Sequence, residues 1–291
     1  MNEIQWLIST SQALGRNSDL VQGTGGNISV KLDGKMIIKP SGVKLEDASR
    51  GYTTVSLEKI LGIYRNELSE DDALKAVFES VIEGGKPSIE TGFHSFLGKY
   101  VVHFHPASMN IILCSEGGEN VISELFADTK YLWMPYIKVG HKLASKIRSA
   151  WNGEEIIFLE NHGIIVQSND RNRCTKNLEE ARKRILNHLS SIIPGFSAFG
   201  YKYEGGFRSG KIRGFLFPDA AVFSVSNKIK ITGDGIQYDE EMRNVDEVLA
   251  ANMYIDEMIG KIGRHKYLTE EEITDLLGME MEKYRRKLVG L

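Results

Sequence analysis

Two histidines lie one residue apart in an apolar run, and this pair is the sharpest chemical signal in the sequence. The run over residues 101–106 reads VVHFHP, and its valine and aromatic residues predict a β-strand. Side chains at positions i and i+2 share one face of a strand, so His103 and His105 project together. Two imidazoles on one face form half of a site for Zn²⁺, which binds nitrogen ligands in tetrahedral geometry. Two histidines without a metal are the alternative for this motif taken alone.

A third histidine, His162, falls in the polar turn ENHG over residues 160–163, between the apolar runs 156–159 and 164–166. We expect this turn to present His162 at a strand end, with Gly163 allowing the backbone to turn tightly beside it. Three protein nitrogens with one open position are typical of catalytic zinc sites, whereas structural zinc sites are closed by four protein ligands. A histidine that merely caps a turn is the alternative here.

A carboxylate, Glu90, precedes the histidine pair in the segment PSIE. Beside a three-histidine metal site, a carboxylate acts as a fourth ligand or as a general base. An ordinary exposed glutamate after a turn is the alternative. The remaining histidines show no comparable spacing and are expected to be structural or to face solvent: His94, His141, His188 and His265.

Two glycine-containing clusters, GTGGNIS over 23–29 and KPSG over 39–42, flank a predicted hairpin that turns at Asp33-Gly34. The hairpin would place both clusters at one end. Their backbone amides and Asn and Ser side chains then form a concave site for an anion such as phosphate, and two ordinary turns are the alternative. The spacing matches neither GxGxxG before a helix nor a Walker A loop, which disfavours a nucleotide site.

The elements that must position these residues follow from the spacing of apolar side chains and from turn residues. The predicted helices are 4–14, 70–83 and 177–192, and the predicted strands are 27–30, 35–38, 101–105, 155–159 and 164–167.

A stretch rich in glycine, residues 194–214, predicts a domain boundary. We expect a first domain over 1–200 and a small C-terminal α+β module over 206–291. In that module, residues 220–225 and 228–232 are predicted to form a hairpin. A long helix over 239–262 and a second helix, which a capping box at Thr269 begins, are expected to follow it.

Composition excludes several classes of function. The 291 residues include 36 Lys and Arg against 39 Asp and Glu, a formal net charge of −3, so nucleic acid is not expected as a partner. No membrane span or signal peptide is expected, because long apolar segments and a basic N-terminal segment are missing from the sequence. The two cysteines, Cys114 and Cys174, are interpreted as ordinary reduced thiols, which favours the cytoplasm.

Taken in order, the motifs GTGGNIS, KPSG, PSIE, HFHP and ENHG resemble those of the class II aldolase/adducin family, over about residues 5–195. This family includes the fuculose-phosphate and rhamnulose-phosphate aldolases and the ribulose-phosphate 4-epimerase. The resemblance implies an α/β fold with α/β/α layers around a central, mainly antiparallel sheet, followed by the C-terminal module. It also implies a homotetramer with active sites at subunit interfaces.

Position by position, the resemblance assigns a role to each candidate residue. His103, His105 and His162 match the zinc ligands, and Glu90 matches the catalytic acid/base of the aldolases. Five positions match phosphate-binding residues: Gly26, Asn27, Ser41, Gly42 and Ser88.

One position departs from the pattern of the aldolases, which carry two serines before the catalytic glutamate where this chain has Ser88-Ile89. The missing hydroxyl removes a hydrogen bond to a phosphate. Either a nearby lysine holds the phosphate, or the substrate carries another polar end. The tyrosine that a neighbouring subunit donates in the aldolases has no clear match, and Tyr131 and Tyr136 are the candidates.

Together these features predict a zinc-dependent aldehyde-lyase of carbohydrate metabolism that acts on a ketose phosphate or a related hydroxy-carbonyl compound. Another divalent transition metal is the alternative to zinc. Glu90 is expected to transfer a proton to or from the carbon of a metal-stabilised enediolate. The 4-epimerases usually carry Asp at this position, which favours aldol chemistry. A decarboxylase, dehydratase or 4-epimerase on the same metal site, or a non-catalytic adducin-like binding protein, is the alternative.

Overall fold

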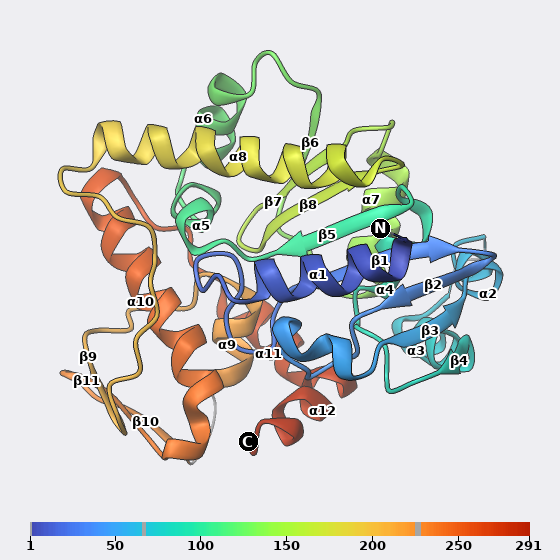
Figure 1. Ribbon diagram of the computed structural model, residues 1–291. Helices are drawn as coiled ribbons and strands as arrows, with labels where there is room; N and C mark the ends of the chain where they lie inside the picture. The colour runs from blue at the N-terminus through green and yellow to red at the C-terminus, as the bar shows by residue number, and fades with distance from the viewer. Residues whose placement is uncertain (1, 66–67, 225–227) are drawn as a thin grey trace.

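A central sheet of eight strands forms the body of the protein in the computed structural model, which describes residues 2–65, 68–224 and 228–291 (Figure 1). The strands are β1 (Asn27–Leu32), β2 (Lys35–Ile38), β3 (Thr53–Ser56), β4 (Val81–Glu83), β5 (Tyr100–Phe104), β6 (Tyr131–Met134), β7 (Ile156–Leu159) and β8 (Gly163–Ser168). Their order across the sheet is β4-β3-β2-β1-β5-β8-β7-β6. Neighbouring strands are antiparallel except for the parallel pair β6 and β7.

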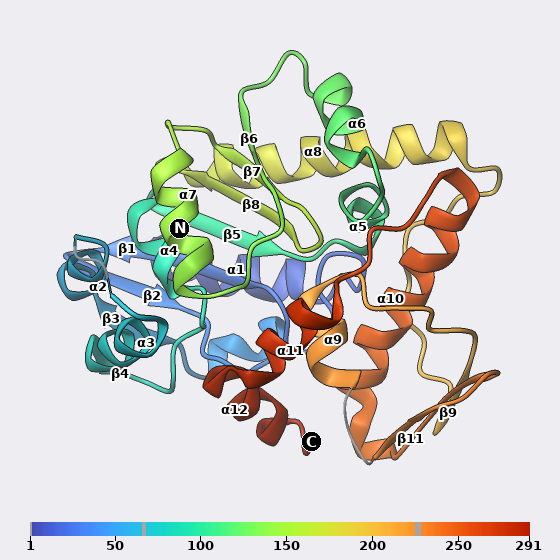
Figure 2. The same cartoon turned by 180° about the vertical axis from the view of Figure 1, so that it is seen from behind.

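Helices cover both faces of this sheet. They are α1 (Glu3–Gly15), the 3-10 helix η1 (Leu45–Arg50), α2 (Leu57–Ile63), α3 (Glu70–Glu79), α4 (Thr91–Phe96), α5 (Ala107–Leu113), α6 (Gly118–Leu125), α7 (His141–Ala150) and α8 (Arg171–Ile192). Figure 1 shows α1 and α8 in front of the sheet, and Figure 2 shows α4 and α7 over the opposite face. Successive residues of β5 face the helix layers on opposite sides of the sheet: Val102 packs in one hydrophobic cluster and Val101 in another. The expected α/β/α fold with a mainly antiparallel sheet is confirmed.

The C-terminal part of the chain adds a small sheet with strand order β10-β11-β9 and several helices. Its elements are β9 (Phe207–Ser209), α9 (Pro218–Ser224), β10 (Ile229–Ile231), β11 (Gly235–Tyr238), the 3-10 helix η2 (Glu240–Met242), α10 (Arg243–Ile262), α11 (Glu270–Gly278) and α12 (Glu280–Leu288). Helix α10 packs against α5 and α9. The main hydrophobic cluster runs from the sheet into this part and includes both Phe104 and Phe217. The division into domains 1–200 and 206–291 stays a prediction.

The hairpin expected from residues 220–225 and 228–232 is wrong. Residues 218–224 form α9, and β10 pairs with β11 instead; residues 225–227 lie outside the described part. Proline at the first helical position and the alanines that follow favour a helix. All residues of α9 are buried, so its sequence lacks the apolar and polar alternation that separates a helix from a strand.

The helix predicted over 70–83 is right only in its first part, because α3 ends at Glu79 and residues 81–83 form strand β4 at the edge of the sheet. Two turn and capping predictions hold. The Asp33-Gly34 turn joins β1 and β2, with φ angles of 49° and 71°. The capping box at Thr269 is present, with its hydroxyl accepting from the backbone of Glu272. Within the described residues, no helix combines the length and apolar character needed to cross a membrane.

Candidate metal centre

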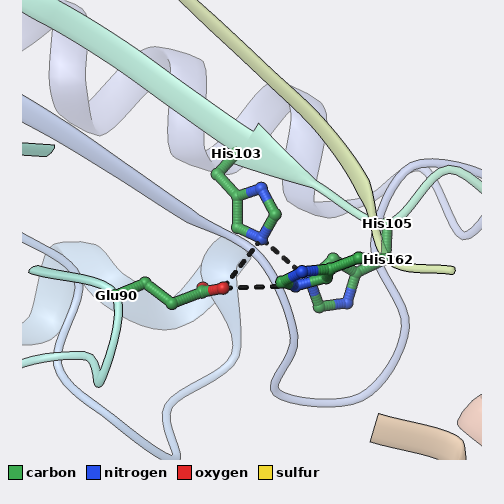
Figure 3. Close-up of side chains that lie close together, drawn as sticks. All are labelled: Glu90, His103, His105 and His162. Atoms are coloured by element: carbon green, nitrogen blue, oxygen red, sulfur yellow. Dashed lines mark hydrogen bonds and ion pairs between the residues drawn. The ribbon is translucent and has the colours of Figure 1, made fainter. Parts of the chain in front are cut away.

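Imidazoles and a carboxylate meet where β5 ends, beside the turn between β7 and β8 (Figure 3). The ligand atoms of Glu90, His103, His105 and His162 all lie within 4.8 Å of one another, and all four residues are buried. Oε1 of Glu90 is 3.2 Å from Nε2 of His103 and 3.2 Å from Nε2 of His162. Nε2 of His105 lies 3.0 Å from Nε2 of His103. The structure therefore brings together the four residues that the sequence singled out for metal and proton chemistry.

Strand β5 delivers two of these side chains from the middle of the sheet. His103 pairs with Asn27 of β1 on one side and with Ile165 of β8 on the other, so its backbone is held from both sides. His105 follows the end of the strand, and Pro106 then begins the entry into α5. The position of both imidazoles is thus set by the central strand pairs of the sheet.

The turn between β7 and β8 brings His162 to the same place. A Cβ atom at Gly163 would lie 2.1 Å from the carbonyl oxygen of Phe104, so a larger residue would push the turn away from β5. Asn161 adopts a positive φ of 51°, which asparagine tolerates better than most residues. Its Nδ2 donates to the carbonyl oxygen of Leu216 at 2.8 Å, which anchors the turn to the C-terminal part.

Burial and neighbouring groups set the protonation of the cluster. Burial lowers the pKa of His162 to about 4, although Glu90 opposes the shift. Burial alone would raise the pKa of Glu90, but the imidazoles of His103 and His162 hold that pKa well below its ordinary value. At neutral pH the cluster therefore holds a neutral His162 and an ionised Glu90, the forms that bind a metal cation.

The geometry fits a divalent transition metal. Ligands about 2.0–2.1 Å from a tetrahedral zinc ion lie about 3.3 Å from one another. The observed separations of 3.0 and 3.2 Å are close to that value. Oε1 of Glu90 is buried and receives no hydrogen bond from the described residues, which is costly for a carboxylate unless a cation is bound. Nδ1 of His103 lies 3.0 Å from the carbonyl oxygen of Ile164, so it donates there and leaves Nε2 free to ligate.

The second oxygen of Glu90 is held by a chain of hydrogen bonds that the sequence analysis did not foresee. Nδ2 of Asn27 donates to Oε2 of Glu90 at 2.7 Å. Oδ1 of Asn27 is hydrogen-bonded to Nε2 of His94, whose Nδ1 lies 2.7 Å from Oγ of Ser29. Burial lowers the pKa of His94 well below its usual range, so the ring is neutral and can donate at one nitrogen and accept at the other. The sequence feature that could have revealed these hydrogen bonds is the i, i+2 spacing of Asn27 and Ser29, which places both side chains on one face of a strand.

The residues expected to bind an anion line one cavity beside Glu90, which also touches His105 and His162. The cavity has a volume of about 30 Å³, which is enough for one or two water molecules. Lys39 lines it as well, but its Nζ donates to the carbonyl oxygens of Thr24 and Val43, and burial lowers its pKa to about 7. The expected anion-binding residues in the lining are Gly26, Asn27, Ser41, Gly42 and Ser88. Their role stays a prediction.

The opposite wall of this cavity comes from C-terminal residues that were not among the predicted site residues. Asp219 on α9 and Glu282 and Arg285 on α12 line it. Nη2 of Arg285 donates to Oδ1 of Asp219 at 2.7 Å, and its Nη1 lies 3.0 Å from each carboxylate oxygen of Glu282. Local spacing could not reveal this group, because Asp219 and Arg285 are 66 positions apart and meet only when the two helices pack.

The two candidate tyrosines lie elsewhere. Tyr131 packs edge-on against Phe158, with ring centroids 5.6 Å apart. The hydroxyl of Tyr136 is buried and has no hydrogen-bond partner within the described chain. Neither residue belongs to the cavity lining, so a contribution from a neighbouring subunit stays a prediction.

Comparisons with known proteins match the N-terminal part of the chain. The model of the Class II Aldolase and Adducin N-terminal domain matches residues 5–185. A curated relative, the uncharacterized oxidoreductase YuxG of Bacillus subtilis (strain 168), is 23% identical over 216 residues, which are 68% of this chain and 31% of the relative. The match therefore spans less than a third of that relative's length.

Two solved structures are similar to part of this chain. The N-terminal class II aldolase domain of a conserved protein from Thermoplasma acidophilum is 25% identical, with a TM-score of 0.60, over 65% of this chain and 94% of that one. A sugar-phosphate aldolase from Thermotoga maritima is 17% identical, with a TM-score of 0.48, over 68% of this chain and 97% of that one. Helices α9 and α12 lie outside the residues that the family model matches.

Proposed function

The chain belongs to the class II aldolase and adducin family, and on that premise we propose that it is a metal-dependent lyase that acts next to the carbonyl group of a small hydroxy-carbonyl compound. The observation that best supports this is the buried cluster in which Nε2 of His103 and Nε2 of His162 lie 3.2 Å from the same oxygen of Glu90. Together with His105, these groups suit zinc or another divalent transition metal. When bound, the metal supplies Lewis-acid stabilisation of negative charge on the substrate oxygens.

Glu90 is the proposed acid/base. Asn27 holds Oε2 at 2.7 Å, and Oε1 faces the histidines, so the carboxylate has one defined orientation. Because Glu90 is ionised at neutral pH, it can take a proton from the carbon next to the carbonyl when a bond is made and return it when a bond is broken. His94 supports this role indirectly, because its hydrogen bond with Oδ1 of Asn27 orients the amide that donates to Glu90.

The anionic or polar end of the substrate is proposed to bind at the other end of the same cavity, against Ser41, Gly42 and Ser88. Arg285 places a positive charge in this cavity. This charge compensates for the hydroxyl that is missing at Ile89, where the aldolases carry a second serine. A cavity of about 30 Å³ is too small for a sugar phosphate. The proposal therefore requires α12 to shift when substrate binds.

The proposal extends to assembly and compartment. We place the enzyme in carbohydrate metabolism as a homotetramer, in which Tyr131 or Tyr136 of a neighbouring copy completes the site. The cytoplasm is the proposed location, and two buried cysteines without a disulfide, Cys114 and Cys174, suit a reducing compartment.

A Glu90→Gln variant tests this function, because glutamine keeps the shape of the side chain but cannot carry the proton. Zinc-loaded protein is incubated with a panel of ketose phosphates and unphosphorylated ketoses, and aldehyde release is measured. We expect release from at least one compound, and a loss of about 10²–10⁴-fold in the variant with zinc still bound by the three histidines.

The matched control is Glu154→Gln, since Glu154 is also buried, pairs with Lys130 at 3.0 Å and does not line the cavity. This control should keep the full rate. The proposal fails if metal-loaded wild-type protein releases no aldehyde from any compound, or if Glu90→Gln is as active as the wild type.

A further inference from the structure

We propose that Asp219 is a positioning residue for the metal ligand His105, an inference that rests on the proposed metal site. Oδ2 of Asp219 lies 3.4 Å from Nδ1 of His105. The other nitrogen of that ring, Nε2, faces His103 at 3.0 Å. The imidazole thus presents one nitrogen to the ligand cluster and the other to a carboxylate.

This arrangement is the one that a metal-binding histidine requires. A ligating imidazole must carry its proton on the nitrogen that points away from the metal. A carboxylate beyond that nitrogen accepts the N–H, fixes the tautomer and the ring orientation, and makes the ligand more basic. His103 has the carbonyl oxygen of Ile164 in this position, and His105 has Asp219.

The surroundings of Asp219 hold it for this contact. The residue is 2% exposed, and Oδ2 has no hydrogen-bond partner in the described part of the chain, so it is free to accept the N–H of His105, whose Nδ1 lies 3.4 Å away. Oδ1 accepts from Arg285 at 2.7 Å, which turns Oδ2 toward His105. The guanidinium of Arg285 is itself packed over the ring of Phe223, 5.1 Å from its centroid. The carboxylate is therefore buried, charge-compensated on one oxygen and directed at the imidazole with the other.

A glycine of the first sequence motif makes room for the contact. A Cβ atom at Gly25 would lie 2.8 Å from Oδ2 of Asp219 and 3.3 Å from Nδ1 of His105. Any side chain there would press between the carboxylate and the imidazole. The GTGG loop, predicted as part of an anion site, thus also admits a carboxylate from the C-terminal part.

The C-terminal part contacts the second ligand-bearing segment as well. Nζ of Lys266 lies 2.6 Å from Oε1 of Glu160, and Asn161 donates to Leu216, so the His162 turn is tied to the same part of the chain. Asp219 lies beyond residues 5–185, which the family model matches. The inference therefore gives the C-terminal part a direct share in the metal centre.

Asp219→Asn tests the inference, because it keeps the size of the side chain. Arg285 needs an acceptor, so the asparagine oxygen will face Arg285 and the amide NH₂ will face Nδ1 of His105. That forces the proton onto Nε2, the nitrogen that must bind the metal. We expect Zn²⁺ affinity, measured by competition with a chromophoric chelator, to fall about 10–100-fold. The Co²⁺-loaded variant should show a changed ligand-field absorption spectrum.

Two further variants separate positioning from packing. Asp219→Ala, which removes more contacts, should weaken Zn²⁺ binding no more than Asp219→Asn, whereas a packing role predicts the opposite order. Asp246→Asn is the matched control: Asp246 is buried and paired with Arg208 at 2.7 Å. It should keep wild-type zinc affinity.

The outcomes distinguish this inference from the proposed function. Wild-type protein that binds no zinc or other divalent transition metal overturns both. Wild-type protein that binds zinc while Asp219→Asn binds it equally well, with an unchanged Co²⁺ spectrum, overturns the role of Asp219 alone.

Discussion

The two walls of the cavity differ in how their elements are joined at the site. The sheet wall carries the histidines, and its backbone is fixed by strand pairs on both sides of β5 and by buried side chains such as Val102 and Phe104. The C-terminal wall carries Asp219 and Arg285 on two short helices, joined by an ion pair of 2.7 Å. Apolar burial holds the first wall in place; α9 is also packed in the main hydrophobic cluster, but its link to α12 at the cavity is a buried ion pair.

We infer from this difference that the sheet wall binds the metal and that the C-terminal wall controls access to it. All four ligand groups come from the sheet wall, although Glu160 and Asn161 also tie the His162 turn to the C-terminal part. The C-terminal wall touches one imidazole and closes the cavity. Buried ion pairs add little net stability but are costly to break, so we expect the C-terminal wall to respond most to changes in charge.

The largest expected effect is the loss of a ligand from the sheet wall. In His103→Ala, the centre loses one of its three imidazoles, and we expect zinc affinity to fall about 10³-fold or more, or about 4 kcal/mol. Equilibrium dialysis with metal analysis measures this. His188→Ala, on α8 and outside the cluster, is the control and should bind one zinc per chain. If His103→Ala still binds one zinc per chain with unchanged affinity, the assignment of the metal site to the sheet wall is wrong.

Sequence spacing was informative for the sheet wall because that wall is made of local elements. The HxH pattern places two side chains on one face of a strand, and a polar turn between two strands places His162 at their shared end. The contact of His94 with Asn27 escaped prediction, since it depends on how helix α4 packs against strand β1.

The C-terminal wall could not be predicted in the same way. Its charges come from segments 66 positions apart, and their meeting depends on how α9 and α12 pack. Helix α9 itself was predicted as part of a hairpin, because a short segment that is buried all round carries no periodic pattern. Spacing identifies side chains on one element, whereas tertiary packing decides which elements share a site.

An intermediate effect is expected when the cation of the C-terminal wall is removed. Arg285→Met leaves the carboxylates of Asp219 and Glu282 buried without their partner, and we expect the free energy of unfolding to fall by about 3 kcal/mol in urea titrations of metal-free protein. The triple variant Arg285→Met, Asp219→Asn, Glu282→Gln removes the charges together and should regain most of that loss.

The matched control for this prediction is an ion pair at the surface. Arg184 pairs with Asp128, whose side chain is 69% exposed, so Arg184→Met should cost less than about 1 kcal/mol. Equal losses in the two arginine variants would contradict the view that buried charges hold the C-terminal wall.

The smallest effect compares two glycines with similar positive φ angles, Gly34 with φ 71° in the β1–β2 turn and Gly42 with φ 75° in the cavity lining. Alanine should cost about 1 kcal/mol at either position for the positive φ alone. At Gly42 the new Cβ would also lie 2.2 Å from Cδ1 of Leu288 on α12, whereas at Gly34 it meets nothing within 4 Å. Gly42→Ala should therefore cost about 0.5–1 kcal/mol more in urea titrations, a modest excess because the exposed Leu288 side chain can turn aside. Adding Leu288→Ala should remove that excess. Equal costs at the two glycines would mean that α12 does not pack against the Gly42 loop. In that case the cavity would be open to substrate without any movement of the C-terminal wall.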